Sequence, residues 1–426
     1  MQLCAVGLPC VVYHSAFCGQ QMTPAYIVSA VRTPMGKFGG SLRELSAADL
    51  GVVVARAALE RVSRAAGDAP LEAAQVEQVI FGCARQAGGG PNVARQITYR
   101  AFGELVGSGI PAFTVNQACA SGMLAIVLGW QEIALGRADC ILAGGTESMS
   151  RVPYLLENAR WGMKMGHQRL TDAMYRDGFL DPLSELVMGE TAEILAEKYQ
   201  VSRDEQDRYA LESHHRAAQA SMSGRFQEEI VPLEVPDPRG KDGPRPVHTD
   251  ETFRAGASLD AMTKLPPVFR QKGSVTAGNA SQLTDGAAAL LLVSERKLRE
   301  WKLRALVRLL DWSRAAVDPR IMGIAPVPAT RTLLERNRWR LDEFDLIELN
   351  EAFAAQVLAC DRELHFPREK LNVNGGAIAL GHPIGCSGAR ITVTLVHELH
   401  RRGGRRGLAT LCVSGGLGLA LALETA

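Results

Sequence analysis

The sequence lacks several features that would place it in common functional classes. Its 47 Lys and Arg residues nearly balance its 46 Asp and Glu residues, and the formal net charge is +1. A chain without a basic excess has no general affinity for the phosphates of a nucleic acid. None of the nine cysteines forms a Cys-x-x-Cys pair, so a zinc or thioredoxin-type motif is not supported. We therefore expect no metal site and no nucleic-acid partner.

The first 21 residues lack the signals of exported or organelle-targeted proteins. No Asp, Glu, Lys or Arg precedes Arg32, whereas a secretory signal has a charged start and a transit peptide has arginines. Pro9 and His14 interrupt the apolar stretch, so we expect no membrane span. Residues 1–21 are interpreted as a disordered extension or a misassigned start, and an organelle address stays open. Cysteines without export signals indicate a reducing, cytoplasmic location.

The rest of the chain has the pattern of an α/β protein with two similar halves. Strand-like and helix-like segments alternate over 25–150 and again over 276–426, which predicts a mostly parallel sheet covered by helices. In both halves a "C-A-S-G" or "C-S-G" turn leads into a helix, and a strand with a glycine turn follows. We interpret this echo as two packed halves with a site between them. Chance similarity of two α/β units is the alternative.

A polar, proline-rich segment separates the two α/β regions. It predicts an inserted loop domain that forms a lid or binds substrate. Within it, Ser202 and Glu205 form a capping box that starts a helix ending at Gly224. The run "PLEVPDPRGKDGPRP" has five prolines and predicts a loop. The predicted domains are the extension 1–21, the first half 22–150, the inserted loop domain 151–275, the end of the first half 276–299, and the second half 300–426.

Cys119 lies where the chain changes from a strand pattern to a helix pattern. Residues 112–116 are strand-like, and 120–135 are apolar on every side, which predicts a buried helix ended by Gly136. At a helix N-terminus, unpaired N–H groups favour a thiolate and can bind an oxyanion. The alternative is an inert core cysteine, which is the more common role of this residue type.

A second candidate, His382, lies in the glycine-rich stretch "NVNGGAIALGHPIGCSGAR" (372–390). Its five glycines predict a loop that turns tightly or approaches a ligand closely. Pro383 pushes the preceding residue into an extended conformation, which would aim an imidazole able to act as a base near neutral pH. A surface histidine without function is the alternative. The stretch lacks the Gly-x-Gly-x-x-Gly spacing of dinucleotide sites, so a dehydrogenase is not favoured.

Two further strand ends carry candidate side chains. In "DLIELNEAFAAQ" a strand runs into Asn350, which is either the N-cap of a helix that starts at Glu351 or a site residue. In "ATLCVSGGLG", Cys412 ends a buried strand before a glycine turn, and core packing is the alternative to a reactive role. Sites in α/β proteins assemble at such strand ends. The set of Cys119, His382 and Cys412 is therefore more specific than any member alone.

Together these segments resemble the thiolase family, the acetyl-CoA C-acyltransferases. "NQACASG", "GNASQLTDGAAA", "NEAFAAQ", "GGAIALGHPIGCSGAR" and "LCVSGG" occur in the family's order, and the resemblance runs from about Tyr26 to the C-terminus. It implies the thiolase fold, in which two similar βαβαβ-type halves form five layers (α-β-α-β-α) with a loop domain inserted in the first half. It also implies reversible acyl transfer from an acyl-CoA to acetyl-CoA, or thiolytic cleavage of a 3-ketoacyl-CoA as in fatty acid β-oxidation.

The resemblance implies a role for each catalytic candidate. Cys119 would accept the acyl group, and His382 would activate its sulfur and polarise a thioester oxygen. Cys412 would move the proton at the carbon beside the carbonyl. Asn350 would hold a water that forms one oxyanion hole with His382, and the backbone N–H groups of Cys119 and Ser414 would form the other.

Coenzyme A is expected as a substrate, and the resemblance implies no cofactor and no metal. Ser281 would contact the pantetheine, and Arg254 would face the nucleotide. Ordinary core filling is the alternative for the two methionines of an apolar tunnel lined by Met188, Met322 and Phe353. The segment "GCARQAGGGPNVARQ" resembles the family's dimer-contact region near the site, so a homodimer or homotetramer is expected.

Three positions depart from the short-chain members of the family. Ser414 and Gln282 replace common glycines, and Val187 replaces a common histidine, whereas "NEAFAAQ" and "ARWGMKMGH" resemble the short-chain type. The acyl chain length therefore stays open. The rival functions are a β-ketoacyl synthase-like condensing enzyme and a non-catalytic acyl-CoA-binding protein on the same fold. The second cysteine, Cys412, favours a thiolase over a synthase, and the complete catalytic set favours an enzyme.

Overall fold

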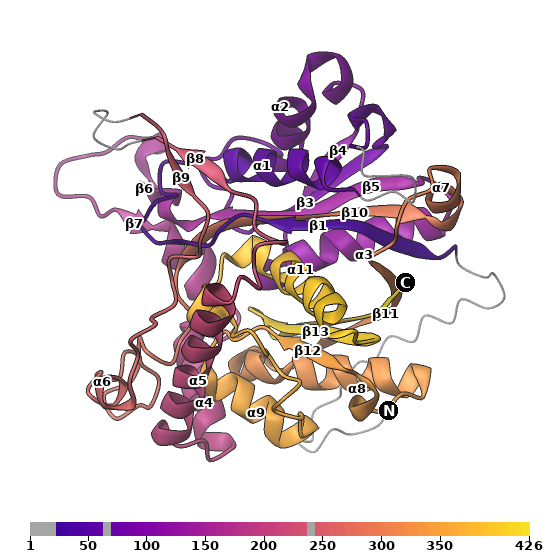
Figure 1. The fold of residues 1–426 in the computed structure, drawn as a ribbon. Coiled ribbons are helices and arrows are strands. Elements are labelled where there is room, and N and C mark those ends of the chain that lie inside the picture. Colours follow the sequence, from indigo (N-terminus) through magenta and orange to yellow (C-terminus); the bar gives the residue numbers. More distant parts are fainter. Residues whose placement is uncertain (1–22, 63–69, 237–242) are drawn as a thin grey trace.

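The computed structural model describes residues 23–62, 70–236 and 243–426, so the predicted extension 1–21 lies outside the described residues. Two sheets lie one above the other, with helices outside and between them (Figure 1). This arrangement confirms the five layers expected from the resemblance. The first sheet is covered by α1 (Ala47–Glu60) and α2 (Val93–Gly107), the middle layer is α3 (Ser121–Ala134) and α11 (Ile384–Arg402), and α8 (Pro326–Asn337) covers the second sheet.

The first sheet joins strands from both ends of the first half. Its order is β4 (Ala112–Val115), β3 (Gln78–Gly82), β5 (Cys140–Ser148), β10 (Thr284–Ser294) and β1 (Ala25–Arg32), with β2 (Gly36–Lys37) beside β10. β3 pairs in parallel with β4 and β5, but β10 runs antiparallel to both of its long neighbours. The chain therefore returns to its first sheet after the long insertion.

The second sheet has the order β12 (Leu346–Leu349), β13 (Arg406–Val413), β14 (Leu417–Thr425) and β11 (Val307–Ala316). Only β12 and β13 are parallel within it. The prediction of a mostly parallel sheet is therefore wrong, and the sheets are mixed. Gly415 and Gly416, with φ of +81° and +80°, turn the chain straight back from β13 to β14, and such a hairpin makes its strands antiparallel. β11 also meets β1 over two residue pairs, which joins the two sheets.

The middle layer brings α3 and α11 unusually close together. A Cβ on Gly122 would lie 2.9 Å from the backbone nitrogen of Ala389, and a Cβ on Gly388 would lie 2.6 Å from that of Met123. Only glycine permits this approach.

The prediction that the stretch 372–390 is a loop is partly wrong. The short helix α10 (Ala377–Leu380) and the start of α11 both lie within it.

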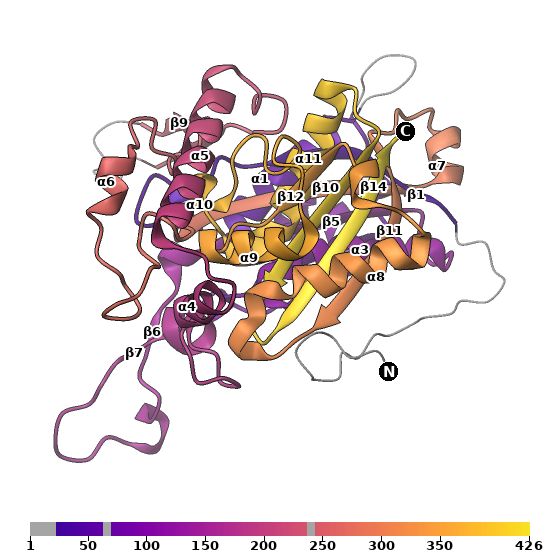
Figure 2. The ribbon, with the colours of Figure 1, turned by 90° about the horizontal axis from the view of Figure 1, so that it is seen from below.

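The insertion gathers on one side of the two halves in both ribbon views (Figures 1 and 2). The capping box is confirmed, because the Glu205 N–H donates to the Ser202 hydroxyl at 3.2 Å and the Ser202 N–H donates to the Glu205 carboxylate at 2.7 Å. The expected loop "PLEVPDPRGKDGPRP" is partly wrong, because its flanks pair as an antiparallel hairpin, whereas 237–242 lie outside the described residues. The elements are β6 (Tyr154–Leu155), β7 (Thr171–Asp172), α4 (Met188–Lys198), α5 (Arg203–Met222), β8 (Leu233–Val235), β9 (Arg245–Val247) and α6 (Leu259–Thr263).

Two remaining helices are α7 (Glu295–Glu300), after β10, and α9 (Ala354–Leu364), after β12. In the described ranges, none of the helices combines the length and the apolar character needed to cross a bilayer. The hydrophobic core follows the layers: one cluster fills the space around α3 and α11 between the sheets, and others lie under the outer helices.

Candidate active site

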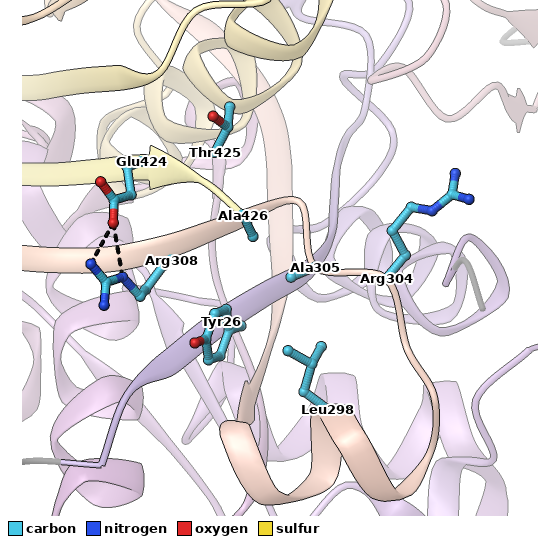
Figure 3. Close-up of a pocket in the computed structure, with 8 residues that line it drawn as sticks. All are labelled: Tyr26, Leu298, Arg304, Ala305, Arg308, Glu424, Thr425 and Ala426. Atoms are coloured by element: carbon cyan, nitrogen blue, oxygen red, sulfur yellow. Dashed lines mark hydrogen bonds and ion pairs between the residues drawn. The ribbon is translucent and has the colours of Figure 1, made fainter. Parts of the chain in front are cut away.

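A surface pocket of about 440 Å³ lies where β1 meets β11 (Figure 3). Within it, the Arg308 Nε donates to the Glu424 carboxylate at 3.0 Å. None of the predicted site residues lines this pocket. Its lining residues are Tyr26, Leu298, Arg304, Ala305, Arg308, Glu424, Thr425 and Ala426.

Cys119 and His382, predicted as nucleophile and base, lie in contact. The His382 Nε2 is 3.3 Å from the Cys119 Sγ, and its Nδ1 is 2.5 Å from the Ser387 Oγ. The Ser387 hydroxyl donates its one proton to the Pro383 carbonyl at 2.9 Å, so Nδ1 must be the donor toward Ser387. The Nε2 is then left as an acceptor facing the thiol. Ser387 is a positioning residue that the sequence analysis missed, although it lies in the first turn of the helix that follows His382.

The electrostatic environment keeps both groups neutral at rest. Burial raises the pKa of the Cys119 thiol to about 11, against the opposing effects of Arg85 and of nearby backbone N–H groups. Burial also lowers the pKa of His382 to about 3, and the positive charge of Arg390 acts in the same direction. The backbone N–H groups favour the thiolate, as expected, but desolvation is the larger effect and keeps Cys119 a thiol in the free enzyme. The thiolate can form when His382 accepts the proton.

Backbone donors surround the sulfur of Cys119. The N–H groups of Ser414 and of Cys119 itself both lower the pKa of that thiol, which places the two predicted oxyanion donors at the reactive atom. The turn that carries Ser414 is held by Asp181, whose carboxylate accepts the Gly415 N–H at 3.2 Å and the Leu183 N–H at 2.9 Å. Asp181 is a second residue that the sequence analysis missed.

Asn350 is fully buried, and neither polar atom of its amide has a hydrogen-bond partner among the described residues. The N-cap interpretation is wrong, because α9 begins at Ala354 and its N-cap is Phe353. The Asn350 N–H donates to the Thr410 carbonyl of β13 at 3.0 Å, so the residue lies beside the strand that carries Cys412. A buried amide without a protein partner is satisfied by a water or a ligand. This fits the predicted role of Asn350 in holding a water.

Cys412 is buried in an apolar cluster with the three predicted tunnel residues, Met188, Met322 and Phe353. Burial raises the pKa of its thiol well above the usual value, and the nearby sulfur of Cys119 adds to this effect. The structure therefore brings together the two cysteines and the apolar residues that were predicted from separate segments. At rest, Cys412 is a thiol and can act as an acid.

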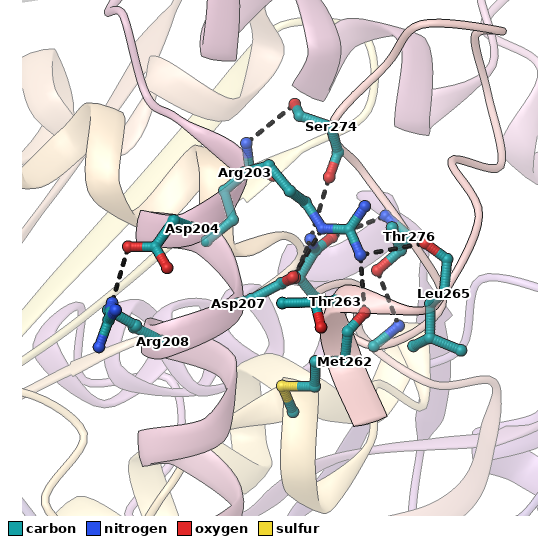
Figure 4. A network of polar contacts seen from close by, with 12 residues as sticks. Arg203, Asp204, Asp207, Arg208, Met262, Thr263, Leu265, Ser274 and Thr276 are labelled. Carbon is teal, nitrogen blue, oxygen red and sulfur yellow. Dashed lines mark hydrogen bonds and ion pairs between the residues drawn. The ribbon is translucent and has the colours of Figure 1, made fainter. Parts of the chain in front are cut away.

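Arg203 and Asp207 of α5 take part in a polar network (Figure 4) that extends to the loop carrying Ser281. The Arg203 Nε donates to Asp207 at 2.7 Å, and Arg203 also donates to carbonyls at the C-terminal end of α6. The opposite oxygen of Asp207 accepts the Asn279 amide at 2.9 Å. Two residues after Asn279, the Ser281 N–H donates to the Ala352 carbonyl at 3.0 Å. The network thus fixes "GNASQ" against both the insertion and the second half.

Arg254 is exposed in the insertion, and its backbone N–H donates to the His214 Nδ1 at 3.2 Å. Burial, with the charge of Arg254 as the second cause, lowers the pKa of His214 to about 4. The structure does not bring Arg254 into the cluster of catalytic candidates. In the parts of the chain that the structure describes, no group of acidic, histidine or cysteine side chains could hold a metal ion.

Glu147 is a third residue that the sequence analysis missed. It is fully buried in β5, and its carboxylate accepts the N–H groups of Ala84 and Arg85 at 3.0 Å each and of Gly385 at 2.8 Å. The signal that could have found it is a charged residue inside a buried, otherwise uncharged strand pattern. The carboxylate fixes the start of α11, three residues after His382.

Comparisons with known proteins all lead to one family. Residues 25–296 match the family described as "Thiolase, N-terminal domain", and 303–425 match "Thiolase, C-terminal domain". The acetyl-CoA acetyltransferase of Pseudomonas aeruginosa is 50% identical over 402 residues, which cover 94% of this chain and 99% of that protein.

Solved structures give the same result. The acetyl-CoA acetyltransferase of Bacillus anthracis superposes with a TM-score of 0.90 at 44% identity and covers 95% of this chain and 99% of its own. Human mitochondrial 3-ketoacyl-CoA thiolase in complex with CoA superposes with a TM-score of 0.88 at 40% identity, with 95% and 98% covered.

The fold and these matches define an enzyme of the acyltransferase class. Within that class, the chain belongs to the thiolase family, and both the predicted fold and the predicted thiolase function are confirmed. The comparisons do not favour a β-ketoacyl synthase or a non-catalytic binding protein.

Proposed function

We propose that this thiolase transfers an acyl group between CoA and acetyl-CoA through an acyl-enzyme on Cys119. In the cleavage direction it would convert a 3-ketoacyl-CoA and CoA into acetyl-CoA and a shortened acyl-CoA. The observation that carries the proposal is the 3.3 Å contact between the Cys119 Sγ and the His382 Nε2, with Nε2 oriented as an acceptor. The relatives named for acetyl-CoA and 3-ketoacyl-CoA support this substrate class.

The first stage breaks the carbon–carbon bond. Cys119 gives its proton to His382 and attacks the 3-keto carbon, and backbone N–H groups stabilise the oxyanion. The bond to the neighbouring carbon then breaks, and the departing acetyl-CoA enolate takes the proton of Cys412. The enolate oxygen is stabilised by His382 and by a water on Asn350. The raised pKa of Cys412 fits this role, because the residue is protonated when the acid is needed.

The second stage returns the acyl group to CoA. The CoA thiol attacks the acyl carbon on Cys119, and its proton replaces the one that Cys412 gave away. Cys119 leaves as a thiolate and recovers its proton from His382. A thioester is exchanged for a thioester, so this stage is nearly balanced in free energy and readily reversible.

CoA would lie along the apolar cluster that contains Cys412. In this arrangement Ser281 meets the pantetheine, Met188, Met322 and Phe353 line the tunnel, and Arg254 in the inserted loop domain (151–275) faces the nucleotide. The cluster of the three apolar residues around Cys412 supports this assignment.

The protein would act as a homodimer or homotetramer in a reducing, cytoplasm-like compartment. The segment "GCARQAGGGPNVARQ" begins at Gly82, the last residue of β3, and runs into α2; part of it would reach the partner subunit. The six cysteines in the described ranges are all free thiols, which fits a compartment without disulfide formation.

The proposal is tested with purified enzyme, CoA and a series of 3-ketoacyl-CoA substrates from four carbons upward. We expect acetoacetyl-CoA plus CoA to give acetyl-CoA, and the kcat/KM series to show which chain length the departures at Val187 and Gln282 favour. Cys119→Ser should abolish turnover. A wild-type enzyme inactive on the whole series, or normal turnover by that variant, would refute the proposal.

A further inference from the structure

Arg85 brings a positive charge to the edge of the active site. It follows β3, and the carbonyl of the preceding Ala84 accepts the Asn116 amide at 3.3 Å. The Asn116 Oδ1 in turn accepts the Ala118 N–H at 2.9 Å. Through this bridge, the backbone at Arg85 is fixed next to the turn that carries Cys119.

The guanidinium of Arg85 lacks a protein partner for a buried donor. Its Nε is buried and makes no hydrogen bond to any described residue. The nearby Glu147 does not supply an acceptor, because its oxygens bind the backbone N–H groups of Ala84, Arg85 and Gly385. A buried donor without an acceptor is destabilising, so a ligand that offers an acceptor there would be stabilised by it.

The guanidinium also lies against the apolar lining of the site. A Cβ on Gly178 would stand 1.9 Å from the Arg85 Nη2, so the guanidinium covers the backbone of Gly178. The next residue, Phe179, packs both on the cluster that contacts Cys119 and on the cluster that contains Cys412. The charge therefore lies at the end of the apolar surface that joins the two reactive sulfurs.

We propose that Arg85 forms an anion subsite at the acyl end of the active site, where it binds the terminal carboxylate of a 3-oxoacyl-CoA. The inference rests on the proposed thiolase function and adds to it a substrate class, acyl chains that end in a carboxylate. A guanidinium binds a carboxylate through two parallel hydrogen bonds. The substrate's methylene groups would pack on Phe179, and its carboxylate would satisfy the buried Nε.

The test compares two probes of equal carbon number, 3-oxohexanoyl-CoA and 3-oxoadipyl-CoA, which end in a methyl group and a carboxylate. We expect the wild-type enzyme to cleave the carboxylate probe with the higher kcat/KM. In Arg85→Gln, the ratio of the two kcat/KM values should fall roughly 10- to 100-fold, the range of a charged hydrogen bond. Arg85→Lys should keep part of the preference, because it retains the charge but loses the paired hydrogen bonds.

Two further variants test whether the position of the Arg85 charge matters as well as its presence. Gly178→Ala keeps Arg85 but displaces its guanidinium, and should also lower the ratio. Arg176→Gln is the matched control: Arg176 lies in the same segment but its side chain is 59% exposed, so the ratio should stay at the wild-type value.

The outcomes separate the subsite from the underlying reaction. A wild-type ratio at or below one, an unchanged ratio in Arg85→Gln, or an equal loss with both probes would overturn the subsite while thiolysis stands. An equal loss would assign Arg85 to stabilising the Cys119 thiolate instead. No cleavage of either probe or of acetoacetyl-CoA by the wild-type enzyme would overturn the proposed function as well.

Discussion

The carboxylate of Glu147 in the first half accepts the N–H of Gly385 in the second half at 2.8 Å. Gly385 lies in the first turn of α11, directly after the segment that carries His382, and a Cβ there would stand 2.7 Å from the Cα of Cys83. The two halves therefore share a buried anchor beneath the Cys119–His382 pair. This anchor sets the imidazole of one half against the sulfur of the other.

Glu147→Gln should loosen that anchor. The amide nitrogen of Gln cannot accept a hydrogen bond, so at least one of the backbone N–H groups of Ala84, Arg85 and Gly385 loses its partner. We expect the free energy of unfolding to fall by about 1–3 kcal/mol, measured by denaturant titration, and kcat to fall more than KM rises. Glu300→Gln, on the exposed helix α7, is the control and should change stability by less than about 0.5 kcal/mol. Equal stability of the two variants would contradict the anchor.

Cys412→Ala should separate proton transfer from acyl transfer. The variant lacks the group that exchanges a proton with the acetyl methyl, whereas Cys119 and His382 remain. Solvent deuterium should then stop entering the methyl group of acetyl-CoA, although some acylation of Cys119 continues. The matched control is Cys360→Ala, which removes another buried thiol, one that donates to the Gly323 carbonyl at 3.3 Å. If Cys412→Ala loses exchange and acylation to the same degree, the two roles are not divided as proposed.

Asn350→Ala should damage catalysis more than folding. The side chain has no hydrogen-bond partner among the described residues, so its removal breaks no bond to the protein itself. A lost oxyanion donor typically lowers kcat roughly 10²–10³-fold, and we expect a loss of that order in steady-state kinetics. A variant that retains full turnover, or one that is strongly destabilised, would show that the amide serves the structure and not the reaction.

His382 should make stability depend on pH in the acidic range. Its pKa is about 3 in the folded protein and about 6.5 when unfolded, so the unfolded chain binds one more proton between these values. The contribution of His382 to stability therefore rises with pH through this window and is lost as the pH falls, by up to about 1.4 kcal/mol per pH unit. His214, with its pKa lowered to about 4, acts in the same direction.

The measurement is the free energy of unfolding as a function of pH for the wild type and His382→Gln. The variant removes the contribution of one titrating group, so its slope between about pH 4 and pH 6 should be less positive than that of the wild type. Parallel curves for the two proteins would show that His382 is not held neutral by its surroundings.

Local patterns in the sequence predicted local structure well. The apolar run after Cys119 predicted α3 and its end before Gly136, which has a φ of +67°. The alternating pattern predicted from residue 25 begins with a strand, β1. These helices and strands depend on residues that are close together in the chain, so hydrophobic periodicity and turn residues are enough to predict where they lie.

Features that depend on contacts between distant segments could not be predicted in the same way. The direction of β10 is set by its pairing with β1 and β5, which lie on the other side of the insertion. The thiol state of Cys119 follows from burial by both halves, which a helix N-terminus in isolation does not reveal. Ser387 acts through the His382 imidazole, and Asp181 and Glu147 act through the backbone N–H groups that they bind. Contacts between distant segments, such as those that Asp181 and Glu147 make, leave little trace in the local sequence.

The proposed reaction requires the transfer of an acyl group to Cys119. The enzyme would be mixed with acetyl-CoA without free CoA, quenched in acid, digested, and examined by mass spectrometry. We predict one acetyl group on the peptide that contains Cys119, its removal when CoA is added, and no such adduct in Cys119→Ser. If the enzyme turns over substrate while its acetyl group is found on Cys412, or on no cysteine at all, Cys119 is not the acyl acceptor.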